Sequence, residues 1–194
     1  MNFLAHFHLA WPQEGLLAGA LEGDYYKGPI GTDLSPEIQA GVRLHRAIDG
    51  FTDAHPRLLE LRRQLPTELR RYAGILCDLS FDHFLCQHWE RFSDTEAEVF
   101  NAAVYATLQS RRLELSAGAQ NMLARLVDHD ILRLYQDWDT VAASAERIGQ
   151  RFRRGNPFIG IERQLTPARS QLESAFLDFY PELTAFSREQ RAAL

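Results

Sequence analysis

Residues 77–89 read Cys77-Asp78-Leu79-Ser80-Phe81-Asp82-His83-Phe84-Leu85-Cys86-Gln87-His88-Trp89. The stretch contains no proline or glycine, and its apolar residues recur at helical spacing. On a helical wheel, Asp78 and Asp82 fall one above the other in the middle of the apolar face, because residues four apart stack on a helix. An ionised carboxylate rarely lies in an apolar stripe unless it is paired or binds a metal. The pattern therefore predicts a central helix whose two carboxylates need a positively charged partner.

Two interpretations of Asp78 and Asp82 follow, and the residues alone leave both open. Two stacked carboxylates repel each other, so both stay ionised only beside a cation. In the first interpretation, arginines of a neighbouring helix form salt bridges with the pair. In the second, the pair holds a metal ion, with His83 at the edge of the same stripe.

The rest of the chain is also helical in pattern. Ser35 followed by Pro36 is a strong helix start, and no segment carries a convincing β pattern. We expect a single domain, residues 1–194, of about eight to ten helices packed as an all-α bundle around the helix that carries Asp82. The expected helices cover approximately residues 1–11, 15–21, 35–53, 58–65, 66–92, 96–113, 116–128, 130–152, and a final pair from residue 166 that is broken at Tyr180-Pro181.

Composition is that of an ordinary soluble protein, with 45% hydrophobic and 24% charged residues. The net charge of −5 provides no general attraction to nucleic acid or to a membrane surface. The two cysteines, Cys77 and Cys86, would point to opposite faces of one helix and cannot form a disulfide there, which suits a reducing compartment. No secretory signal or membrane span is recognisable, so a cytoplasmic location is expected.

His45 and Asp49 form a second pair of residues four apart, on the same helical face as Ile38 and Val42. A His–Asp hydrogen bond that closes a core would explain this pair alone. Together with the first helix, however, the inward residues offer a set of nitrogen and oxygen donors without thiolates, which suits Mn, Fe, Mg or Zn. Such an ion polarises a phosphoryl oxygen and activates a water. The candidate ligands are Asp24, His45, Asp49, Asp78 and Asp82.

Five segments in this order and spacing resemble the acyl carrier protein phosphodiesterase family: Met1-Asn2-Phe3-Leu4-Ala5-His6, Gly23-Asp24, His45-Arg46-Ala47-Ile48-Asp49-Gly50-Phe51-Thr52-Asp53, Asp82-His83-Phe84-Leu85-Cys86-Gln87-His88-Trp89, and Phe176-Leu177-Asp178-Phe179-Tyr180-Pro181. The resemblance implies a cytosolic bacterial enzyme that removes 4′-phosphopantetheine from holo-acyl carrier protein. It also implies a divalent metal, Mn²⁺ first with Mg²⁺ or Fe²⁺ as alternatives, and a distant relation to the HD-domain phosphohydrolases. In this chain Asp82 precedes His83, the reverse of the HD order, so ligands cannot be carried over from HD enzymes.

The metal ligands are therefore assigned from the helical wheel. We expect His83, His6 and Asp82 to be the catalytic residues, with His83 or His6 either acting as the general acid for the leaving serine oxygen or holding the water. Carrier proteins are acidic, so their docking face should be basic. The candidate docking residues are Arg43, Arg46, Arg62, Arg63, Arg70 and Arg71, with a second cluster at Arg151, Arg153 and Arg154.

Two other functions fit the same residues. An HD-like phosphohydrolase would act on a nucleotide or another small phosphodiester, and metal chemistry would be the same. A non-catalytic helical binding module would use the inward Asp and His residues only as structural pairs.

Overall fold

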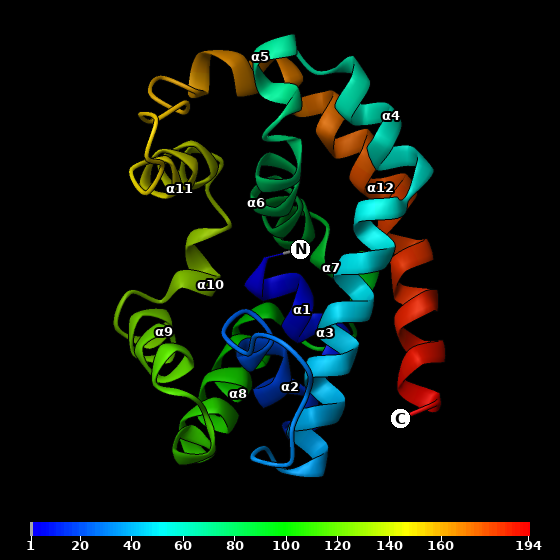
Figure 1. Ribbon diagram of the computed structural model, residues 1–194. Coiled ribbons are helices and arrows are strands. Elements are labelled where there is room, and N and C mark those ends of the chain that lie inside the picture. Colours follow the sequence, from blue (N-terminus) through cyan, green and yellow to red (C-terminus); the bar gives the residue numbers. More distant parts are fainter. Residues whose placement is uncertain (1) are drawn as a thin grey trace.

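The computed structural model describes residues 2–194. This part of the chain contains twelve α-helices and one 3-10 helix, joined by turns and loops, and no strand (Figure 1). The all-α prediction is confirmed. The number of helices exceeds the expected eight to ten because three of them have only four residues each. The helices are α1 (Phe3–Ala10), α2 (Glu14–Glu22), α3 (Pro36–Ala54), α4 (Pro56–Gln64), α5 (Thr67–Arg70), α6 (Ala73–Gln87), α7 (Trp89–Phe92), α8 (Ala97–Ser110), η1 (Arg112–Glu114), α9 (Ala117–Asp128), α10 (Ile131–Leu134), α11 (Asp139–Gly149) and α12 (Glu162–Ala192).

Helices α2 and α3 cross at two glycines, and this crossing positions the N-terminal half of the molecule. A Cβ atom on Gly41 would lie 2.7 Å from the Cα atom of Gly19, so any larger residue would push the helices apart. Helix α3 begins as the sequence predicts: Pro36 is its first residue, and the Ser35 hydroxyl accepts a hydrogen bond from the Ile38 amide (3.4 Å). The close crossing places the middle of α3 against the end of α2.

The prediction of one long helix over residues 66–92 is wrong, because the chain leaves helical geometry at Tyr72 and again at His88. The ring of Tyr72 packs against Phe152 and Phe158, with centroids 5.8 and 5.1 Å away. After the second break, the Trp89 indole N–H donates to the Thr95 carbonyl oxygen. Contacts with distant residues therefore outweigh the helical pattern of the local sequence.

The predicted break at Tyr180-Pro181 is also wrong. Helix α12 runs through both Pro167 and Pro181 for 31 residues, although an interior proline costs about 3 kcal/mol. Phe176, Tyr180 and Leu183, on both sides of Pro181, are fully buried, and their packing fixes the helical path. No helix within residues 2–194, α12 included, has both the length and the apolar composition that crossing a bilayer requires.

Helix α6 lies in the centre of the molecule, as predicted, and both of its cysteines are free thiols. Its Asp82 is fully buried and accepts hydrogen bonds from the first-turn amides of α1, at Leu4 (2.9 Å) and Ala5 (3.1 Å). Burial raises the pKa of Asp82 to about 7 against the opposing effect of these two bonds. The positive partner that the sequence demanded is therefore a helix N-terminus.

This placement differs from the surroundings that we expected for Asp82 as a metal ligand and a catalytic residue. Both interpretations of the sequence considered a side-chain or metal cation, and neither considered backbone amides. Within residues 2–194, Asp82 forms no ion pair with an arginine, and its two oxygens are bonded to α1. Asp78, four residues earlier, is only half-buried.

Removing the Asp82 carboxylate should destabilise the fold. Asp82→Ala leaves the amides of Leu4 and Ala5 buried without acceptors, at roughly 1–3 kcal/mol for each unsatisfied donor. Asp82→Asn keeps one acceptor oxygen and should lose less. Urea unfolding of the three proteins gives the free energies, and an Asp82→Ala variant as stable as the wild type would show that α1 does not depend on this residue.

Candidate functional site

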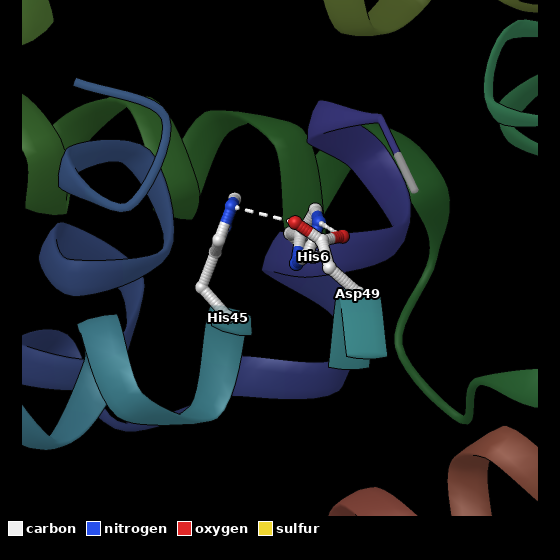
Figure 2. A group of neighbouring side chains, drawn as sticks. All are labelled: His6, His45 and Asp49. Atoms are coloured by element: carbon white, nitrogen blue, oxygen red, sulfur yellow. Dashed lines mark hydrogen bonds and ion pairs between the residues drawn. The ribbon is translucent and has the colours of Figure 1, made fainter. Parts of the chain in front are cut away.

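Two imidazoles and one carboxylate converge where α1 meets α3 (Figure 2). The Nε2 atom of His6 lies 3.2 Å from Oδ1 of Asp49, and the Nε2 atom of His45 lies 3.2 Å from Oδ2 of the same carboxylate. Their candidate ligand atoms all lie within 4.8 Å of one another. We call His6, His45 and Asp49 the triad.

Packing holds the triad from three sides. His45 and Asp49 are one turn apart on α3, as the sequence predicts. The rings of His6 and His45 stack with centroids 4.0 Å apart and an interplanar angle of 15°. The His45 ring also lies against Gly23, where a Cβ atom would come within 2.4 Å of His45 Cγ, so only glycine fits there.

Burial and hydrogen bonding set the charges of the triad. Burial lowers the pKa of His6 to about 3, so this imidazole is neutral near pH 7. Burial alone would raise the pKa of Asp49, but hydrogen bonds from His45 and His6 outweigh it and hold that pKa well below its ordinary value. A neutral imidazole and an ionised carboxylate are the protonation states in which these groups bind metal.

The donor set of the triad suits a divalent metal ion. Donor atoms about 2.0–2.2 Å from one ion lie about 3–3.5 Å apart, and the two His–Asp distances fall in that range. The Nε2 atoms of His6 and His45, which face the carboxylate, are the candidate ligand atoms in this arrangement. A set of two histidines and one carboxylate that is open to solvent on one side suits Fe²⁺, Mn²⁺ or Zn²⁺. The open side is that of Asp49, whose side chain is 42% exposed.

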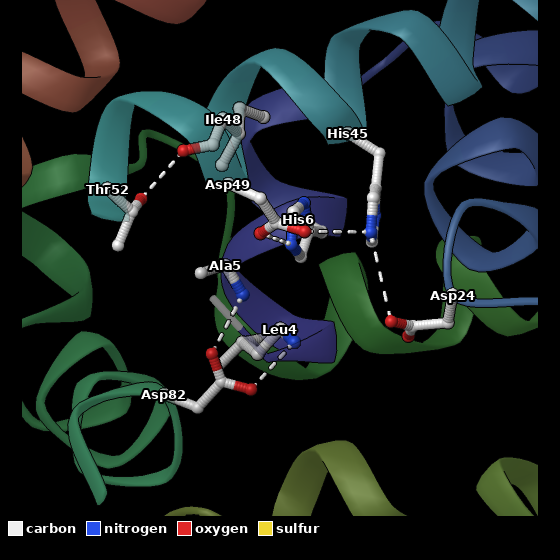
Figure 3. Close-up of polar contacts among 9 residues, drawn as sticks. All are labelled: Leu4, Ala5, His6, Asp24, His45, Ile48, Asp49, Thr52 and Asp82. Atoms are coloured by element: carbon white, nitrogen blue, oxygen red, sulfur yellow. Dashed lines mark hydrogen bonds and ion pairs between the residues drawn. The ribbon is translucent and has the colours of Figure 1, made fainter. Parts of the chain in front are cut away.

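One further predicted ligand, Asp24, lies beside the triad, and another, Asp78, lies within the electrostatic influence of Asp49. Asp24 follows α2 and places Oδ1 3.8 Å from Nε2 of His45 (Figure 3). It is 48% exposed, and its pKa is raised by burial despite the nearby His45. The pKa of Asp78 on α6 is also raised, chiefly by burial and further by the charges of Asp49 and Asp53.

His83 and Asp82 are not brought to the triad. In Figure 3, Asp82 points to the start of α1, and the ligand cluster lies further along that helix. His83 donates a hydrogen bond from Nδ1 to the Tyr135 carbonyl oxygen (2.8 Å). Its Nε2 accepts a hydrogen bond from the guanidinium group of Arg169 (3.2 Å). Its ring packs on Trp138. Both ring nitrogens of His83 are thus occupied by structural contacts.

The predicted docking arginines are divided among several places. Arg46 donates to the Tyr26 carbonyl oxygen, Arg63 pairs with Glu60, and Arg70 donates to the Leu65 carbonyl oxygen. Arg71 instead lines a groove of about 570 Å³ together with the second predicted cluster, Arg151, Arg153 and Arg154. We call this the basic groove.

Sequence reasoning missed a second concave feature. A pocket of about 350 Å³ is lined by Asp24 together with Arg125 and Arg147. Neither arginine was a candidate binding residue in the sequence analysis. These arginines come from α9 and α11, far in sequence from the triad, so no local motif joins them to it. The pocket also includes Arg151, which it shares with the basic groove.

Comparison with known proteins assigns the chain to a family. A family model described as acyl carrier protein phosphodiesterase matches residues 1–183. The acyl carrier protein phosphodiesterase of Pectobacterium atrosepticum is 29% identical over 192 residues, which cover 98% of this chain and 100% of the relative. Those of Salmonella dublin and Salmonella agona are 32% and 31% identical over 186 residues, 95% of this chain and 96% of each relative.

No solved structure matches the chain. The family match nevertheless spans α1 to α11 and most of α12, and so includes every residue of the triad. The chain therefore belongs to the acyl carrier protein phosphodiesterase family.

Proposed function

We propose that this protein hydrolyses the phosphodiester between 4′-phosphopantetheine and a serine of holo-acyl carrier protein. The products are apo-acyl carrier protein and 4′-phosphopantetheine. The observation that carries the proposal is the triad, a set of donors that could hold a metal ion, within a chain that matches the family over residues 1–183. We further propose that the protein works in the cytoplasm.

His6, His45 and Asp49 would hold a divalent cation, with Asp24 at its edge; Mn²⁺ is the first candidate, and Mg²⁺ and Fe²⁺ are alternatives. When bound, such an ion supplies positive charge for a phosphoryl oxygen and favours the hydroxide form of water. The protein's part is to keep His6 neutral by burial, which leaves a ring nitrogen free of a proton for the ion, and to supply Asp49 with a pKa well below its ordinary value.

Asp78 is our proposed general acid, in place of His83 and His6. As the water oxygen bonds to phosphorus, the bond from phosphorus to the serine oxygen breaks, and the leaving oxygen must take a proton. Asp49 has a lowered pKa and Asp78 a raised one, and two carboxyl groups whose pKa values are pushed apart can divide ligand and acid roles. A carboxyl group with a raised pKa retains its proton to higher pH.

We propose that the acidic carrier protein docks at the basic groove. Arg71, Arg153 and Arg154 line one concave surface, and within residues 2–194 none of them forms an ion pair. Arg63, by contrast, is already paired with Glu60. Charged groups of this kind steer association more than they add affinity.

The direct test is to incubate the purified protein with holo-acyl carrier protein and Mn²⁺ and to weigh the carrier protein by mass spectrometry. Loss of the phosphopantetheine mass is the expected result, and chelator should prevent it. Parallel incubation with small phosphodiesters, nucleotides included, shows whether the carrier protein is required. An unchanged carrier protein in all metal conditions would contradict the proposed function.

Asp49→Asn and Asp78→Asn should separate ligand from acid. Asp49→Asn should lose bound metal, measured by elemental analysis after dialysis, and kcat should fall by about 10²-fold or more. Asp78→Asn should keep its metal and its KM, while kcat falls by about 10²–10⁴-fold, the usual contribution of acid catalysis. If Asp78→Asn instead loses the metal, the residue is a ligand and the acid lies elsewhere.

Charge reversal should locate the docking face. Arg153→Glu combined with Arg154→Glu should raise KM for holo-acyl carrier protein with little change in kcat, and the effect should shrink at high salt, where attraction is screened beyond about 8 Å. Arg62→Glu combined with Arg63→Glu on α4 is the matched comparison. A larger KM increase for the α4 pair would move docking to that helix.

A further inference from the structure

The pocket that begins at Asp24 has two chemically different parts. Three arginines, Asp24, Asn2 and Ser144 form its polar part, and the other lining side chains are apolar or aromatic. Its volume of about 350 Å³ lies within the range of small-molecule sites, about 300–1,000 Å³. The lining residues are Asn2, Phe3, Asp24, Tyr25, Leu79, Met122, Arg125, Ile131, Tyr135, Ser144, Arg147, Ile148 and Arg151.

The arginines of this pocket are available to an anion. Arg125, Arg147 and Arg151 are exposed, and within residues 2–194 none of the three forms an ion pair or a hydrogen bond with another side chain. Three unpaired guanidinium groups around one pocket, in a protein of net charge −5, form a local positive field. Guanidinium groups bind phosphate oxygens with two parallel hydrogen bonds, so the field suits a phosphate.

The apolar part suits an extended organic chain. Leu79 of α6, Met122 of α9 and Ile148 of α11 come from three helices and face the same space. The half-buried ring of Tyr25 adds an aromatic wall. Tyr25 is seated against α9 at Gly118, where a Cβ atom would come within 2.6 Å of the tyrosine ring.

One lining residue of the pocket lies beside the triad, and another is shared with the basic groove. Asp24 lines it and lies 3.8 Å from Nε2 of His45. Arg151 lines both the pocket and the basic groove. A phosphate bound beside Asp24 would therefore lie near the proposed metal ligands, and the rest of the ligand would have the space lined by residues of α6, α9 and α11.

We propose that this pocket binds the phosphopantetheine arm of the substrate. Arg125 and Arg147 hold the phosphate oxygens, while Leu79, Met122 and Ile148 contact the arm beyond it. The assignment rests on the proposed function, because that function supplies a ligand with one phosphate and one long, uncharged arm. It adds what the triad lacks, a means to recognise the phosphopantetheine half of the phosphodiester, which carries the phosphorus that water attacks.

Binding of the product tests the pocket without catalysis. Isothermal titration of 4′-phosphopantetheine into metal-free protein, with chelator present, measures the pocket apart from the triad. Arg125→Ala and Arg147→Ala should each weaken binding about tenfold or more, since a hydrogen bond to a charged group is lost. Arg163→Ala, an exposed arginine of α12 outside the pocket, is the control and should bind as the wild type does.

Three ligands establish which part of the product is recognised. Pantetheine, without phosphate, should bind weakly and should not respond to Arg147→Ala. Inorganic phosphate should bind weakly and should not respond to Ile148→Asp, a change that should weaken 4′-phosphopantetheine. Phosphate or AMP binding as tightly as 4′-phosphopantetheine would overturn the assignment to the arm, and so would full product affinity in both arginine variants.

The outcome is distinguishable from failure of the proposed function. If the wild type releases phosphopantetheine from holo-acyl carrier protein and Arg125→Ala and Arg147→Ala keep its KM and product affinity, the pocket is wrong and the function stands. If the wild type binds 4′-phosphopantetheine through these arginines but cleaves no carrier protein, the function is wrong and the pocket stands.

Discussion

The hydrogen bonds from the first turn of α1 to Asp82 are the interaction on which the candidate site depends. A fully buried carboxylate on α6 meets two amides that an isolated helix would leave unsatisfied, and each group offsets part of the other's desolvation cost. The bond fixes where α1 begins on α6, and His6 follows on α1 within one turn. Asp82 thus acts on the site through the backbone, without being part of the triad.

The close approach of α2 and α3 positions His45, the second histidine of the triad. Glycines at the α2–α3 crossing bring His45 against the end of α2, and Gly23 leaves room for its ring. The ring of His6 then stacks on it, so that both Nε2 atoms face the Asp49 carboxylate. Burial on one side and exposure of Asp49 on the other give a site that is dry at the imidazoles and open toward a substrate.

Sequence patterns correctly predicted the features that depend only on neighbouring residues in the chain. The spacing of His45 and Asp49 gave their common face, and Ser35-Pro36 gave the start of α3. Patterns failed where a distant partner decides: Asp82 looked like half of a cation site because its real partner, the start of α1, is 77 and 78 residues away. Pro181 looked like a helix end because buried aromatics elsewhere in the fold keep α12 continuous. Arg125 and Arg147 carried no signal, since only the folded chain brings α9 and α11 to one pocket.

The shortness of α1 has a consequence for the local stability of the site. A helix of eight residues is too short to persist alone, since isolated helices below about 12–15 residues are marginal in water. Its helical state therefore depends on its packing against α2, α3 and α6. Local opening of α1 needs less free energy than global unfolding, and it would be enough to take His6 away from Asp49.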